Sequence, residues 1–169
     1  MPTVLLGDDT VSLKGDLPSE NEQAPDFTFV KDDFSEGTLY EYGDKTKVIL
    51  AVLSMDTGVC QAETRRFNEE LGKRNNVVGL VISKDLPFAM KRVCENDGID
   101  SIISASDFRY NDFGDKYNVV MIDGNLKGTF SRAVFVVDGS NTVRHSQLVP
   151  AVGTEPDYEA ALAAVDTIG

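Results

Sequence analysis

Cysteine and histidine are both scarce in this sequence. It has two cysteines and one histidine among 169 residues. Two cysteines are too few for the disulfide framework of a small secreted domain. His145 stands alone and no CxxC motif is present, so a structural zinc site is hard to build. Three interpretations of Cys60 and Cys94 therefore stay open: a redox pair, two inert core thiols, or one reactive and one inert thiol.

Positive charge is also in short supply. Lysine and arginine total 16 against 28 aspartates and glutamates, which gives a net charge of −12. The basic clusters are only pairs, such as 65–66 and 91–92, and both of these have acidic neighbours. An acidic chain of this kind repels phosphate, so a general nucleic-acid-binding function is not expected.

Long hydrophobic runs are absent. The apolar runs, such as 48–53 and 133–137, have the length of strands and are far too short to span a membrane. The first residues lack the apolar core of a signal peptide, so the sequence predicts a cytoplasmic protein. Apolar residues make up 41% and charged residues 26%, which is typical of a globular chain, and no linker or repeat divides it. One domain is expected.

Strands and helices are expected to alternate along the chain. The runs at 47–53 and 77–83 are almost wholly apolar, which indicates strands buried on both faces. The other expected strands are Thr3–Leu6, Val11–Leu13, Phe27–Val30, Ser101–Ser104, Ala133–Val137 and Thr142–Leu148. Helices are expected from Gly58 to Leu71, from an Asp85 cap to Gly98, near Phe113–Tyr117, and after Thr154-Glu-Pro-Asp157. This order predicts an α/β fold with a mixed sheet covered on both faces; a thioredoxin-like arrangement fits, as do several other small α/β folds.

Two helices should each present an apolar stripe. In the first, the stripe comprises Cys60, Thr64, Phe67 and Leu71. Its charged residues are expected mainly off that stripe: Glu63, Arg66, Glu69 and Glu70. In the second, the apolar face comprises Leu86, Met90, Val93 and Cys94.

The segment Ser54-Met-Asp-Thr-Gly-Val-Cys60 follows a buried strand and opens a helix. Functional groups in α/β sheets collect at the carboxyl ends of strands. In the first helical turn, free N–H groups and the helix dipole favour the thiolate form of Cys60. The Thr57 hydroxyl is placed to bond that thiolate or a substrate oxygen beside it. The alternative is that Cys60 is simply a buried core thiol, and this is the better interpretation of Cys94 from the residues alone.

Asp56-Thr57-Gly58 is also the tripeptide of aspartic proteases. In those enzymes two carboxylates share a proton, so a second copy of the tripeptide is required. The chain contains no second Asp-Thr-Gly or Asp-Ser-Gly, and a helix-forming segment follows directly. The protease interpretation is therefore not favoured.

The motif Thr57-Gly-Val-Cys60 would be weak alone, but it is preceded by Ser54-Met-Asp56 and followed by Arg65-Arg-Phe-Asn68. It stands among further characteristic segments, which in order are Lys14-Gly-Asp-Leu-Pro18, Ala24-Pro-Asp-Phe27, Ser83-Lys-Asp-Leu-Pro-Phe-Ala89, Cys94, Ser106-Asp-Phe108, Lys127-Gly128, Ser131-Arg-Ala-Val-Phe-Val136 and Glu155-Pro-Asp-Tyr-Glu-Ala-Ala161. In this order and spacing, the chain resembles the thiol peroxidases, the atypical two-cysteine branch of the peroxiredoxins, over nearly its whole length.

This resemblance implies specific roles. Cys60 matches the peroxidatic cysteine, Thr57 the threonine of the active-site motif, Arg132 the active-site arginine, and Cys94 the resolving cysteine that closes an intrachain disulfide. Without the family, nothing would select Arg132 over the other arginines.

The resemblance also implies a setting. It predicts one thioredoxin-fold domain over residues 1–169 with a hairpin extension at 1–25, usually a homodimer. The substrates would be hydrogen peroxide and organic hydroperoxides, the reductant thioredoxin, and no metal or cofactor would be needed. The alternative function is a non-enzymatic thioredoxin-fold redox sensor or binding protein, which would react slowly with peroxide. One residue departs from the pattern: Leu53 stands where the family motif usually has proline, which predicts a freer loop before Asp56.

Overall fold

The apolar run within residues 47–53 forms an inner strand of the sheet. In this computed structural model, which describes residues 1–169, β5 (Thr46–Ala51) is buried at every position. It pairs in parallel with β6 (Val77–Ser83) and antiparallel with β8 (Ala133–Val137). The apolar runs of the sequence are therefore inner strands, as predicted.

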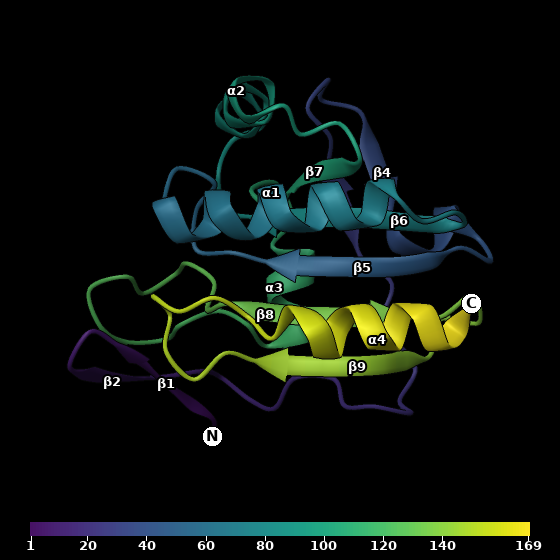
Figure 1. The fold of residues 1–169 in the computed structure, drawn as a ribbon. Helices are drawn as coiled ribbons and strands as arrows, with labels where there is room; N and C mark the ends of the chain where they lie inside the picture. The colour runs from purple at the N-terminus through teal and green to yellow at the C-terminus, as the bar shows by residue number, and fades with distance from the viewer.

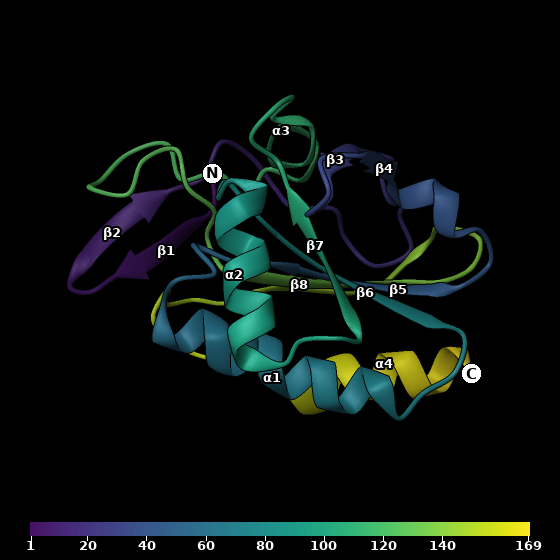
Figure 2. The ribbon, with the colours of Figure 1, turned by 90° about the horizontal axis from the view of Figure 1, so that it is seen from above.

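Seven strands make up this mixed sheet, in the order β4-β3-β7-β6-β5-β8-β9. Its other members are β3 (Thr28–Val30), β4 (Glu36–Thr38), β7 (Ile102–Ser106) and β9 (Val143–Leu148). Helices cover both faces, as Figures 1 and 2 show. They are α1 (Gly58–Gly72), α2 (Pro87–Asp97), α3 (Asp112–Tyr117) and α4 (Tyr158–Ile168), with a short 3₁₀ helix η1 (Leu39–Tyr42). The predicted thioredoxin-like α/β class is confirmed.

Each face of the sheet has its own hydrophobic core. On one side, α3 packs an aromatic cluster in which Phe113 lies 4.9 Å from Phe27 and 4.5 Å from Tyr117 between ring centroids. On the other side, α1, α2 and α4 cover β5, β6 and β8, and this second core contains Cys60. None of the helices combines the length and the hydrophobicity that a membrane-spanning segment requires.

The N-terminal hairpin lies outside the large sheet. Strands β1 (Thr3–Leu6) and β2 (Asp9–Ser12) pair antiparallel across a turn in which Gly7 has a φ of 62°. Isolated bridges join it to later loops, Leu5 to Ala151 and Leu13 to Met121. Figure 1 shows it at the end of the molecule where the β5 arrow ends and α1 begins. The predicted hairpin is confirmed, although its second strand begins two residues earlier and ends one residue earlier than expected.

Two expectations about α2 are wrong. Its N-cap is Leu86, whose side chain is half exposed instead of lying in the apolar face. Asp85 does not cap the helix, because its carboxylate faces the loop after β5, where it accepts hydrogen bonds from Ser54 Oγ at 3.0 Å and the Met55 N–H at 2.7 Å. The carboxylate is thus used to hold the loop that leads to Cys60. Pro87 in the first turn and Gly98 as the left-handed C-cap are confirmed.

Candidate active site

Cys60 lies in the first turn of α1, at the carboxyl end of β5. Its side chain is fully buried, with 0% of the residue exposed. Thr57 is the N-cap: its Oγ1 accepts a hydrogen bond from the Cys60 N–H at 3.4 Å and donates one to the Ser54 carbonyl at 3.3 Å. The predicted strand–turn–helix placement of Cys60 is confirmed. The structure places the Thr57 hydroxyl against the backbone of Cys60 and gives it no hydrogen bond to the sulfur.

Arg132 is the side chain in contact with the Cys60 sulfur. It precedes β8 and is 1% exposed. Its Nη1 donates to Cys60 Sγ at 3.3 Å and to Glu63 Oε2 at 2.6 Å. Its Nε and Nη2 both donate to the Val152 carbonyl, at 3.2 and 2.9 Å. Burial lowers the pKa of Arg132, but the charges of Cys60 and Glu63 outweigh burial and raise it, so the guanidinium remains charged beside the sulfur.

Glu63 is a site residue that the sequence analysis missed. It was expected mainly off the buried stripe of α1, yet it is fully buried against Arg132. Its Oε1 is buried without a hydrogen-bond partner. Burial raises the pKa of Glu63 to about 7, although its ion pair with Arg132 acts in the opposite direction. The spacing in the sequence does indicate this position. Residues three apart on a helix share a face, so Glu63 lies beside Cys60.

This arrangement places two acidic groups, Cys60 and Glu63, around one buried guanidinium. Glu63→Gln should therefore change how stability depends on pH. The folded-state pKa of Glu63 lies above its ordinary 4.5, so the native state holds a proton that the unfolded chain releases. Stability from this group is greatest at low pH and is lost as the pH rises from about 4.5 towards 7.

Urea unfolding of the reduced protein at about pH 5 and pH 8 checks this expectation. The difference in free energy of unfolding between wild type and Glu63→Gln should decrease, to the disadvantage of wild type, from about pH 5 to pH 8. Glu69→Gln is the matched control, since Glu69 is exposed on the same helix. Equal pH dependence in wild type and Glu63→Gln would show that Glu63 does not titrate in this range.

Cys94 lies on the neighbouring helix, α2. Both thiols are free, and Cys94 is half-buried against the same hydrophobic core that contains Cys60. Burial raises the pKa of the Cys94 thiol to about 11, and the carboxylates of Asp32, Asp97 and Glu95 add to that. The structure thus brings Cys60 and Arg132 into contact, and it leaves Cys94 as a protonated thiol on the next helix.

The loop before Cys60 is held although it lacks the proline of the family motif. The Asp85 carboxylate binds the loop at Ser54 and Met55. Leu53 itself packs against both the Cys60 core and the hydrophobic cluster of the N-terminal hairpin. Its N–H donates no backbone hydrogen bond, so a proline here would remove none.

Leu53→Pro is expected to speed oxidation of Cys60 modestly, by about 1 kcal/mol or less in barrier, because the ring restricts the loop. Stopped-flow oxidation and the melting temperature should be measured together. Leu53→Ala is the control, since it removes the side chain without adding the ring. A folded Leu53→Pro protein that oxidises more slowly than wild type would contradict the expectation.

A groove of about 610 Å³ opens beside this site. Asp56 and Gln61, from the turn that carries Cys60, line one side, and Phe88, Arg92 and Val93 of α2 line the other. The groove therefore lies between the two helices that bear the cysteines, although neither cysteine lines it.

Comparison with known proteins gives a consistent result. Residues 19–162 match the sequence profile of the Redoxin family. A thiol peroxidase from Leptospira interrogans is 46% identical over 168 residues, covering 98% of each chain. A thiol peroxidase from Staphylococcus aureus is 45% identical over 158 residues, covering 94% of each chain. The crystal structure of a peroxiredoxin-like protein from Aquifex aeolicus superposes with a TM-score of 0.93 at 39% identity, covering 99% of this chain and 97% of that one.

Proposed function

The chain belongs to the redoxin family and is a thiol-dependent peroxidase, and we propose that Cys60 is the cysteine that reacts with the hydroperoxide. The observation that carries this assignment is the contact between Arg132 Nη1 and Cys60 Sγ, at 3.3 Å in a fully buried site. A cation that donates to the sulfur favours the thiolate, which is the nucleophilic form of cysteine.

In the first step, the Cys60 thiolate attacks the terminal oxygen of hydrogen peroxide or an organic hydroperoxide. An S–O bond forms, the O–O bond breaks, and its electron pair leaves on hydroxide or alkoxide, which then takes a proton. The sulfur is oxidised to a sulfenic acid and the peroxide is reduced. The Arg132 guanidinium supplies donors and positive charge where negative charge develops on the oxygens, in a site from which water is excluded. Thr57 contributes by capping the turn that presents the sulfur.

In the second step, the sulfenic acid of Cys60 condenses with the Cys94 thiol. A disulfide forms and water is released. A dithiol reductant of the thioredoxin type then returns both sulfurs to thiols by exchange, and takes up the disulfide itself. Such reductants keep cytoplasmic thiols reduced, and the cytoplasm is where we place this cycle.

We also propose a homodimer. An exposed apolar surface on the α2 side supports it: Phe88 is 71% exposed and Leu86 51%. The Phe88 ring lies 4.8 Å, between centroids, from that of Phe34 in the loop between β3 and β4. Aromatic residues are enriched at protein–protein interfaces, so this exposed pair supports the proposal.

Stopped-flow oxidation of the reduced protein tests the proposed function. Hydrogen peroxide and an organic hydroperoxide should each oxidise one cysteine rapidly, and turnover should follow when thioredoxin, its reductase and NADPH are present. Slow oxidation without turnover would favour the alternative, a redox sensor.

Arg132→Met should slow this oxidation by about 10²–10³-fold, since a charged donor at the reacting atoms is lost. The substitution also leaves the buried Glu63 carboxylate unpaired, which destabilises the fold. The double variant Arg132→Met with Glu63→Gln removes that penalty and should remain as slow. An oxidation rate within threefold of wild type in the double variant would contradict the role of Arg132.

A further inference from the structure

The Val152 carbonyl makes two of the four hydrogen bonds of the Arg132 side chain. It accepts from both Nε and Nη2, at 3.2 and 2.9 Å. The remaining two contacts, from Nη1, reach Cys60 and Glu63. The direction in which the guanidinium presents Nη1 to the sulfur therefore depends on where the Val152 carbonyl lies.

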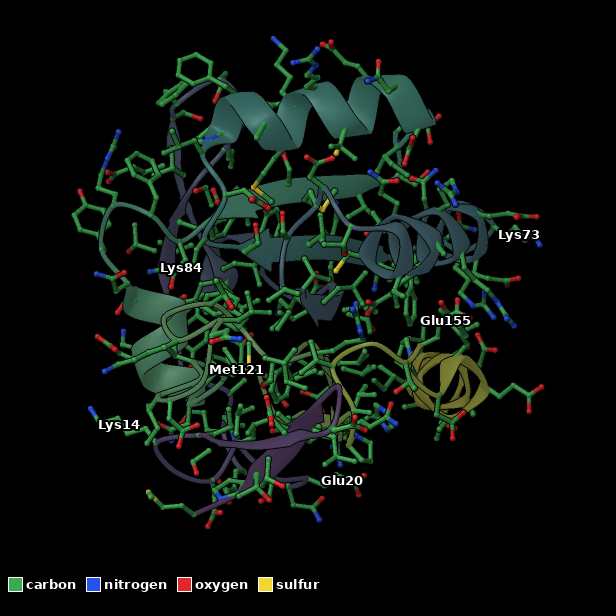
Figure 3. The ribbon with its side chains drawn as sticks, turned by 90° about the vertical axis from the view of Figure 1, so that its left-hand side faces the viewer. Lys14, Glu20, Lys73, Lys84, Met121 and Glu155 are labelled. Carbon is green, nitrogen blue, oxygen red and sulfur yellow. The ribbon has the colours of Figure 1, made fainter.

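The N-terminal hairpin fixes the backbone at Val152. Its first strand lies beside residues 150–152, in a parallel bridge between Leu5 and Ala151. The Leu5 N–H donates to the Pro150 carbonyl at 2.8 Å, and the Val152 N–H donates to the Leu5 carbonyl at 2.8 Å. Leu5 thus holds the segment on both sides of Ala151. Figure 3 views the molecule from this end and shows the hairpin next to Met121.

The side chain of Val152 is held by the same hairpin. It is 2% exposed and belongs to a small cluster separate from the two main cores. The other buried members are Val4, Val11, Leu13 and Met121. Because β1 and β2 lie outside the seven-stranded sheet, the hairpin is not needed to complete that sheet. Its contacts instead fix loops at the catalytic end.

We propose that the N-terminal hairpin is a positioning element of the active site: through Leu5 it fixes the Val152 carbonyl, and that carbonyl orients the Arg132 guanidinium on Cys60. This inference rests on the proposed function. Its physical basis is the steep dependence of an aligned displacement on position, since a shift of about 1 Å can cost 10²-fold in rate. The hairpin and Val152 touch no reacting atom.

Leu5→Pro is the direct test. Proline removes the Leu5 N–H that holds Pro150, and the Leu5 side chain is nearly half exposed, so its loss costs little packing. The variant should fold and oxidise about tenfold more slowly than wild type. Thr10→Pro is the matched control in the same hairpin. Thr10 lies opposite Leu5 in the hairpin. The N–H and the carbonyl of Leu5 both bond to residues 150–152, so Leu5 and Thr10 exchange no backbone hydrogen bond. The oxidation rate of Thr10→Pro should stay within twofold of wild type.

Combining Leu5→Pro with Arg132→Met shows whether the hairpin acts by positioning Arg132 or only by supporting the fold. If Leu5 acts through Arg132, the hairpin change should slow the Arg132→Met protein no further. The inference is overturned if folded Leu5→Pro oxidises as fast as wild type, or if the tenfold loss persists in the Arg132→Met background. Wild type that fails to react with peroxide would instead refute the proposed function.

A second variant serves if Leu5→Pro does not fold. Val4→Ala removes two buried methyl groups from the hydrophobic cluster that contains Val152 and leaves every backbone donor in place. It should slow oxidation about threefold in the wild-type background and not at all with Arg132→Met. A rate equal to that of wild type, in a protein whose melting temperature has fallen, would overturn the inference.

Discussion

Cys60→Ser is expected to abolish peroxide reduction while the protein stays folded. Serine has nearly the same shape as cysteine, and its hydroxyl can still accept a hydrogen bond from Arg132. An alcohol does not ionise near neutral pH, so the nucleophile is lost. Cys94 does not replace it, because burial raises its pKa to about 11 and its thiol stays protonated. Peroxide consumption with the thioredoxin system present should fall to the rate without protein.

The fold of this variant should be checked by its melting temperature and far-UV circular dichroism. Cys94→Ser is the matched control, since it also exchanges one sulfur for oxygen in the same hydrophobic core. Only Cys60→Ser should lose the first, stoichiometric reaction with peroxide. Turnover at the wild-type rate in Cys60→Ser would refute the assignment of the nucleophile.

The sequence predicted the main sheet and helices because their patterns are unambiguous. The runs within 47–53 and 77–83 are apolar at nearly every position, and their short length and β-branched residues indicate strands buried on both faces instead of buried helices. The elements that it missed, β4 and η1, span three and four residues. Segments this short show no periodicity, and β4 contains a glycine that argues against a strand.

Asp85 shows a different kind of failure. Aspartate one or two residues before a helical proline is a common cap, so the local pattern favoured that role. Its carboxylate instead binds Ser54 and Met55, which lie about thirty positions earlier in the chain. A local rule cannot predict a tertiary partner that becomes available only when β5 and β6 lie side by side.

The residues of the candidate site were predictable to different degrees. The position of Cys60 between a buried strand and a helix makes it a candidate but leaves a buried core thiol as the alternative, whereas Arg132 is selected only through the family resemblance. Glu63 was missed because amphipathic patterns assign charged residues to solvent, and its burial is tolerated only beside the Arg132 guanidinium. The Val152 carbonyl could not have been found, since a backbone acceptor leaves no trace in the residue type.

Cys94→Ser is expected to keep the first reaction and lose turnover. The variant should consume about one equivalent of peroxide as Cys60 becomes a sulfenic acid, and excess peroxide should then oxidise that acid further. Thioredoxin should not sustain catalysis, because no intrachain disulfide can form. Mass spectrometry of oxidised wild type should show that disulfide. If it shows only intermolecular disulfides, Cys94 is not the resolving cysteine.

The environment of Cys94 also predicts how fast the disulfide forms in wild type. The attacking species is the Cys94 thiolate, and burial against the core keeps this thiol protonated, with a pKa of about 11. Its helix, α2, begins at Pro87, and the N-cap Leu86 makes no side-chain hydrogen bond. Local opening of α2 is the step that would release the thiol from burial. A second kinetic phase should therefore follow the peroxide reaction, with a rate that is independent of peroxide concentration and rises with pH as more thiolate forms. Low urea, which favours local opening, should accelerate this phase in wild type. A phase slowed by low urea would mean that Cys94 attacks from the closed helix, and that opening of α2 plays no part in resolution.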